Sequence, residues 1–181
     1  MLLSIDNQEL KQAEDLKNNW KLKEALNILD KFDLNDDMST QVKFQFYYLK
    51  GSILIDLLAT NEALKYAELA YKESKKLRSD YQIINALLLK NHIFASLLEP
   101  NNQLETINEA EQLLARNNQN SSQEFKVMKG RVLSCKGGYN FSIGNLDLSL
   151  RFFSEAAQLA NEIDDKKLIL RTTKWLGFVY S

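Results

Sequence analysis

Few residues in this chain have the chemistry that a catalytic or metal site requires. His92 is the only histidine and Cys135 the only cysteine among 181 residues. A nucleophilic triad needs a histidine held against a serine or cysteine and an acid, and a zinc site needs several ligands at close spacing. The sequence also has no glycine-rich phosphate loop and no dinucleotide fingerprint. It therefore predicts no enzymatic activity, no cofactor and no metal, and gives Cys135 a packing role and His92 a structural or groove-lining one.

Charged clusters are the remaining candidates for chemistry. The acidic pairs at residues 36–37 and 164–165 lie at expected turns beside helix starts, where exposed amides favour negative charge. The basic residues of segment 72–78 close an expected helix, where positive charge satisfies terminal carbonyls. We interpret all three as helix-end features. The alternatives are acid–base or metal chemistry at the acidic pairs, and a patch for phosphate or an acidic partner at the basic segment.

The composition indicates an ordinary soluble chain. Hydrophobic residues make up 45% and charged residues 26%, near the averages for globular proteins. The 23 Lys and Arg nearly balance the 24 Asp and Glu, so a net charge of −1 provides no general attraction to nucleic acid or anionic lipid. One cysteine excludes an intrachain disulfide, and no segment has the roughly 20 apolar residues of a membrane span. We expect a cytoplasmic protein without nucleic-acid or membrane partners.

The elements that must carry any site are helices. One proline and six glycines leave long uninterrupted stretches, which predicts an all-α chain. Helix starts are indicated by capping boxes at Asp6, Ser79, Asn102 and Ser121, each with Glu or Gln three residues later. The expected helices cover residues 6–18, 21–32, 39–58, 61–78, 80–98, 103–117, 122–143, 146–163 and 166–181.

Five glycines fall inside these expected helices, where each costs roughly 1 kcal/mol relative to alanine. Close helix packing is the interpretation for Gly51, Gly130, Gly137, Gly138 and Gly177. A helix break is the alternative for the adjacent pair Gly137 and Gly138.

A small residue followed by a hydrophobe recurs along the chain. The pairs begin at Ala25, Ala63, Thr106 and Ser149, which are 38, 43 and 43 residues apart. Self-similarity at a period of about 20 to 50 residues is typical of stacked repeat proteins, in which each unit buries its apolar face against its neighbours. We expect a single domain over residues 1–181. Its four helical hairpins would cover residues 6–38, 39–79, 80–120 and 121–164, followed by an unpaired helix at 166–181.

The fourth of these units resembles a tetratricopeptide repeat (TPR). The small, turn and packing positions that carry the resemblance are Gly137, Gly144-Asn145, Ser149-Leu150, Phe153 and Ala156. The other units match less completely, and the repeats run near 40 residues instead of about 34, as in the longer-helix variety of the family. The family's usual closing proline is missing. The only proline, Pro100, falls inside the third unit, where an enlarged turn from Glu99 to Gln103 is expected.

The resemblance implies a right-handed α-solenoid of antiparallel hairpins that serves as a non-enzymatic scaffold for proteins or peptides. Projection of the family's inward positions gives the expected groove as Gln45, Tyr48, Asn85, His92, Arg131, Ser134, Arg171 and Lys174. The implied ligand is a segment with an acidic portion, whose carboxylates would lie near Arg131, Arg171 and Lys174. The alternative is that these are ordinary solvated helix residues.

The final expected helix, residues 166–181, carries more apolar residues than one neighbour covers. This predicts either a fragment of a longer repeat array or self-association through that helix. A second class of function also stays open: the chain would be the sensor or regulatory part of a larger signalling ATPase or transcription regulator. Its catalytic or DNA-binding domain would then lie outside these residues.

Overall fold

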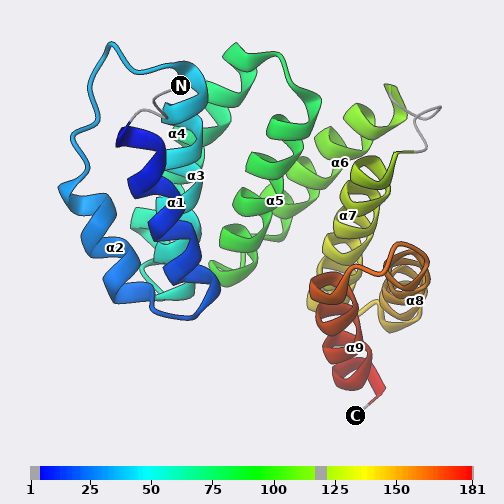
Figure 1. Ribbon diagram of the computed structural model, residues 1–181. Helices are drawn as coiled ribbons and strands as arrows, with labels where there is room; N and C mark the ends of the chain where they lie inside the picture. The colour runs from blue at the N-terminus through cyan, green and yellow to red at the C-terminus, as the bar shows by residue number, and fades with distance from the viewer. Residues whose placement is uncertain (1–4, 117–121, 181) are drawn as a thin grey trace. The chain divides into compact units, whose positions relative to one another are not determined.

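The computed structural model describes residues 5–116 and 122–180, and these ranges are all-α (Figure 1). Its helices are α1 (Ile5–Asn18), α2 (Leu22–Lys31), α3 (Thr40–Asp56), α4 (Thr60–Leu77), α5 (Asp80–Ser96), α6 (Pro100–Arg116), α7 (Gln123–Ser142), α8 (Leu146–Glu162) and α9 (Lys166–Tyr180). The expected helices are therefore confirmed over the described ranges, and their ends agree to within about two residues everywhere except at the start of α6.

Helix α6 begins at Pro100, so the expected enlarged turn is wrong. Proline suits the first helical position because its missing N–H would have no intrahelical acceptor there and its φ is already helical. The Glu99 amide donates to the Phe94 carbonyl at 3.0 Å, and the Gln103 amide donates to the Glu99 carbonyl at 3.1 Å. The turn between α5 and α6 is therefore tight, and Asn102 lies within the helix instead of capping it.

The other expected caps fall into two groups. Ser79 accepts a 3.4 Å hydrogen bond from the Gln82 amide, which confirms the cap at the start of α5. Ser121 and the side chain of Asp6 lie outside the described residues. Helix α7 is capped by Ser122, whose hydroxyl oxygen accepts from the Phe125 amide at 3.2 Å.

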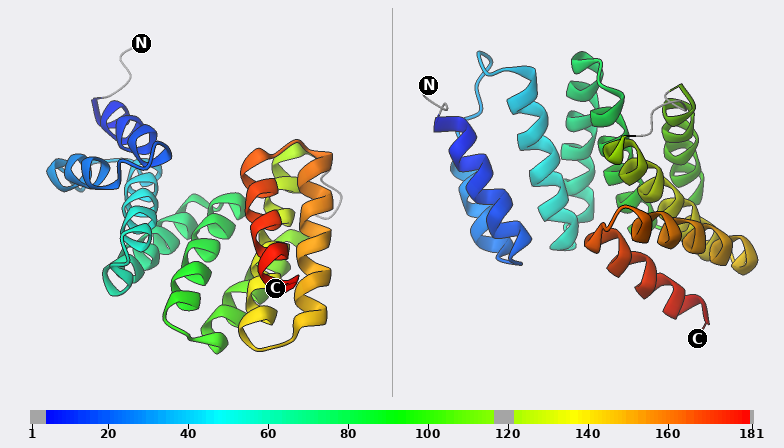
Figure 2. Two further views of the ribbon diagram at one scale, coloured as in Figure 1. Left: turned by 90° about the horizontal axis from the view of Figure 1, so that it is seen from below. Right: turned by 45° about the vertical axis from the view of Figure 1, so that its right-hand side comes forward.

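The chain divides into two compact units, Met1–Ile93 and Phe94–Ser181. In the first unit, α1 packs on α2 and α3 packs on α4, and α1 also contacts α3. In the second unit, α7 packs on α8, and α9 contacts both of these helices. Figure 2 shows α8 and α9 side by side and running in opposite directions. Within each unit, adjacent helices thus form antiparallel pairs.

Within residues 5–116 and 122–180, the hairpins α1–α2, α3–α4, α5–α6 and α7–α8 turn through the same backbone geometry. A residue in the left-handed conformation stands at Trp20 (φ 59°), Leu58 (φ 64°), Leu98 (φ 58°) and Gly144 (φ 78°). In all four turns the amide of the following residue donates to a carbonyl five residues earlier, at 2.8 to 3.0 Å. This is the Schellman arrangement that commonly ends a helix.

A buried side chain also stands at one fixed position after each of these turns. Five residues after the left-handed residue, each hairpin has a buried side chain, at Ala25, Ala63, Gln103 and Ser149. In the third hairpin this position is Gln103, so the spacings are 38, 40 and 46 residues. Thr106, which begins the third pair of the sequence pattern, is also buried, one turn further along the same helix face.

Close packing explains three of the helical glycines. A Cβ on Gly137 would lie 2.8 Å from the Phe153 ring, one on Gly130 would lie 2.5 Å from Leu168, and one on Gly51 would lie 3.2 Å from Leu89. The same construction on Gly138 and Gly177 meets nothing within 4 Å, so close packing is wrong for those two. Helix α7 runs unbroken through the Gly137-Gly138 pair, so the helix break is also wrong.

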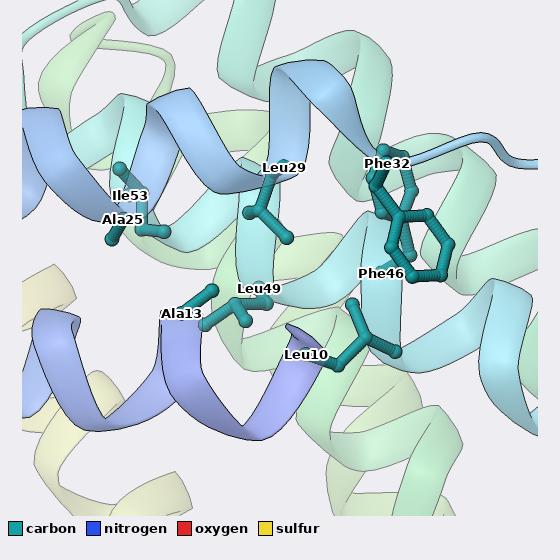
Figure 3. Close-up of a cluster of buried hydrophobic side chains, with 8 residues drawn as sticks. All are labelled: Leu10, Ala13, Ala25, Leu29, Phe32, Phe46, Leu49 and Ile53. Atoms are coloured by element: carbon teal, nitrogen blue, oxygen red, sulfur yellow. The ribbon is translucent and has the colours of Figure 1, made fainter. Parts of the chain in front are cut away.

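The core of the first unit forms where α1, α2 and α3 meet. Figure 3 shows small and large apolar side chains converging from these helices: Leu10, Ala13, Ala25, Leu29, Phe32, Phe46, Leu49 and Ile53. The rings of Phe32 and Phe46 stack with their centroids 5.3 Å apart. Burial of this apolar surface is the main force that holds the helices together, because a single hairpin could not remove it from water.

Candidate functional site

Two neighbouring helices of the second unit supply half of the expected groove residues. Helix α7 carries Arg131 and Ser134, and α9 carries Arg171 and Lys174. The two α9 side chains are exposed and Arg131 is half-buried. Ser134 is only 2% exposed, and its hydroxyl has no hydrogen-bond partner among the described residues. Ser134 therefore belongs to the interior, whereas the three cations offer a surface.

The charges of the two arginines act on the buried thiol of Cys135. Burial raises the pKa of Cys135, and the positive charges of Arg171 and Arg131 oppose that rise. The two arginines come from helices that touch, because α7 contacts α9.

Helix α9 is basic, and its cations Arg171 and Lys174 have no carboxylate partner within the described residues. Its sequence contains Lys166, Lys167, Arg171 and Lys174 and no acidic residue. By contrast, two of the three lysines of α7 have carboxylate partners: Lys136 lies 2.6 Å from Glu111, and Lys126 pairs with Glu162. The positive charges of Arg171 and Lys174 are thus available to an anionic group from outside.

Aromatic side chains lie beside these cations. The Trp175 ring stacks on Phe153 with centroids 5.4 Å apart, and it meets Phe141 and Phe178 edge to face at 5.6 and 5.9 Å. Phe178 is 52% exposed, and the Lys174 ammonium lies 5.8 Å from its ring centroid. The surface of α9 therefore combines positive charge with an accessible aromatic edge.

The expected groove residues of the first unit form a less charged set. Gln45 and His92 are exposed, and Tyr48 is half-buried with its ring stacked on Phe44 at 5.8 Å. Asn85 is buried and donates from its side-chain amide to the Tyr81 carbonyl at 3.1 Å. Asn85 therefore supports its own helix, while Gln45, Tyr48 and His92 reach the surface.

One charged residue that sequence reasoning missed is Lys50, which is buried on α3. Its ammonium lies 2.8 Å from the Asp30 carboxylate and 4.8 Å from the Tyr66 ring centroid. Burial would lower the pKa of Lys50, but hydrogen bonds to Asp30 and Tyr66 outweigh that effect and hold the pKa above its ordinary value. No sequence spacing links Lys50 to Asp30, because the pair joins two helices.

A second buried charge, Glu73, lies on α4. One carboxylate oxygen accepts from Lys76 at 2.6 Å, and the other has no partner among the described residues. Burial, and then the charge of Glu73, raises the pKa of Tyr47 on α3.

Comparisons with protein-family models, with curated proteins and with solved structures gave no match to this chain. The TPR resemblance therefore stays a prediction from the sequence. None of the helices in the described ranges combines the length and the apolar character that crossing a bilayer requires.

Proposed function

We propose that this chain is a non-enzymatic module that binds a protein or peptide segment with an acidic portion. The observation that carries the proposal is the surface of α9, where Arg171 and Lys174 are exposed and lack a carboxylate partner within the described chain. An unpaired cationic surface favours an anionic ligand because binding replaces hydration with charge-assisted hydrogen bonds.

Different side chains of this surface would bind different parts of the ligand. A guanidinium can hold a carboxylate through two parallel hydrogen bonds, which suits Arg171 and its neighbour Arg131. Lys174 adds a mobile positive charge next to Phe178. An exposed aromatic ring is an effective anchor for an apolar side chain of a ligand. The preferred ligand therefore alternates acidic and apolar residues.

The hairpin geometry supports the architecture that we propose for the whole chain. Four turns with one backbone geometry and a buried residue in the same phase are what a regular repeat requires. We propose that the hairpins stack as a right-handed solenoid of the TPR type in a cytoplasmic protein. The first helix of each hairpin would then line the inner surface, with Gln45, Tyr48 and His92 on one part and the α9 cations on another.

A peptide array read by fluorescence tests the function. Acidic segments with interspersed apolar residues should be retained, and the doubly reversed variant Arg171→Glu with Lys174→Glu should weaken their binding at least about tenfold. The matched control is Arg151→Glu on α8, which reverses an exposed charge already paired with Glu155 at 3.0 Å. Equal binding of acidic and neutral segments, or unchanged affinity in the double variant, would contradict the proposal.

A further inference from the structure

Three of the four hairpin turns expose a large apolar side chain to water. Trp20 is 78% exposed, and Leu58 and Leu98 are each 83% exposed. Each of them is the left-handed residue of its turn. Hydrophobic residues scattered singly on a surface need no explanation, but the same position in successive repeats is not a random scatter.

The turn geometry does not call for these residues. A side chain in the left-handed conformation is strained by roughly 1 kcal/mol, and glycine avoids that strain. Gly144 shows that glycine makes the same turn here, with φ 78°. Between α4 and α5 the left-handed residue is Arg78, and between α8 and α9 it is Asp164, and both are polar. The Asp164 turn has the same geometry, since the Asp165 amide donates to the Ala160 carbonyl at 3.0 Å. The strained apolar residues thus occur only at the turns within hairpins, which indicates that their side chains have a function there.

In the first unit, the two apolar turns are neighbours. The Lys17 ammonium, three residues before Trp20, lies 3.4 Å from the carboxylate of Asp56, two residues before Leu58. Both turns stand at the lower end of their helices in Figure 1. Trp20 and Leu58 therefore form one patch, which we name the turn patch.

The two ends of the turn patch carry opposite charge. Residues 17–24 contain three lysines and one glutamate, whereas residues 55–62 contain two acidic residues and no basic one. Lys23 and Glu62 are exposed, and neither has an ionic partner among the described residues. A surface that is positive at one end and negative at the other is complementary to a second copy of itself related by a two-fold axis.

We propose that two copies of this chain associate through the turn patch about a two-fold axis. Trp20 of one copy packs against Leu58 of the other, and Lys23 faces the second copy's Glu62. The dimer is weak and concentration-dependent, because two large side chains per copy provide less apolar area than stable dimers bury. An anionic lipid surface fits less well, because the three acidic residues of segments 17–24 and 55–62 cancel the charge of their three lysines.

Sedimentation equilibrium of the full chain tests the association over roughly 10 µM to 1 mM protein. We expect a reversible dimer whose dissociation constant rises at least about tenfold in Trp20→Gly and in Leu58→Gly. Neither variant should unfold at a lower temperature than the natural chain does, because glycine relieves the left-handed strain. A loss of association therefore cannot be attributed to misfolding.

Charge exchange tests the two-fold geometry. Lys23→Glu and Glu62→Lys should each weaken the dimer, and the double variant should restore it, since the exchanged charges again face each other. The matched control is Lys72→Glu, at an exposed position near the opposite end of α4, which should leave the dimer unchanged.

Four results would overturn the proposal. They are a monomer across the whole concentration range, a dimer that Leu58→Gly does not weaken, a double charge exchange that fails to restore association, and a dimer lost instead on Leu170→Ser with Phe178→Ser. The last would locate self-association on α9. A monomer that binds lipid vesicles through Trp20 would also overturn the proposal, because the partner of the turn patch would then be a membrane surface and not a second copy.

Discussion

The Ser149 hydroxyl donates a 2.9 Å hydrogen bond to the carbonyl oxygen of Gly137, which joins α8 to α7 inside the second unit. One turn after Ser149, the Phe153 ring covers the space where a Cβ on Gly137 would stand. The two helices therefore touch where both have small residues. Gly137 lies seven residues before the left-handed residue Gly144. In the other three hairpins the residue at that spacing is Ala13, Gly51 or Asn91, and all three are buried.

Gly137 and its neighbour Gly138 should respond in opposite ways to the same change. Gly137→Ala should lower the free energy of unfolding by about 1 to 3 kcal/mol, because its Cβ would lie 2.8 Å from Phe153. Gly138→Ala should raise it by about 0.5 to 1 kcal/mol, because the added methyl meets nothing within 4 Å and alanine favours the helix. Urea denaturation followed by circular dichroism measures both, and a shared sign would contradict this account of the contact.

The interaction of Lys50 with Asp30 should make stability depend on alkaline pH. Because the folded-state pKa of Lys50 is raised, its contribution is complete below the unfolded value of about 10.4 and is lost as pH rises through the folded value. Asp30→Asn should cost about 1 kcal/mol at pH 7, a modest figure because the Asp30 side chain is half-exposed.

Denaturant unfolding between pH 8 and pH 11 measures this dependence. The Asp30→Asn variant should lose less stability over that range than the natural chain does. An equal loss in both proteins would show that other groups cause the alkaline effect, with Tyr47 the first to test because its pKa is also raised.

Cys135 should be unreactive while the chain is folded. Burial raises the pKa of its thiol and so suppresses the thiolate that reacts. Removal of the opposing charges in Arg131→Ala or Arg171→Ala should raise that pKa further and slow modification again. Labelling with a chromogenic disulfide at pH 8 should be slow without urea and complete in it; rapid labelling of the folded chain would contradict the burial of this residue.

The left-handed turn residues of the second unit provide a matched pair of substitutions. Leu98→Gly should raise the free energy of unfolding by about 0.5 to 1 kcal/mol. It removes strain at φ 58°, and little buried apolar surface is lost because Leu98 is exposed. Gly144→Ala should lower it by about 1 kcal/mol, because it introduces strain at φ 78°. Thermal unfolding measures both changes, and a stability loss in Leu98→Gly would show that the Leu98 side chain has a packing role.

The sequence by itself determined the helices and most of their ends. Helix formation depends on neighbours within about four residues, so periodic apolar residues and a cap such as Ser79 can be recognised in the local sequence. The small residues Ala25, Ala63 and Ser149 also stood out, because helices that touch exclude large side chains at those points. The same local signal failed near Pro100, where proline at a first helical position resembles proline in a loop.

Only the tertiary structure decided which side chains meet. Gly137 and Gly138 look alike in sequence, yet one faces Phe153 and the other faces open space. Asn85 and Ser134 were expected in a groove and are buried. Packing against neighbouring helices, and not residue type, decides which helix positions are exposed. The strained Trp20 and Leu58 could not be recognised before the turns were seen, since a left-handed φ is a property of the folded backbone that holds it in place.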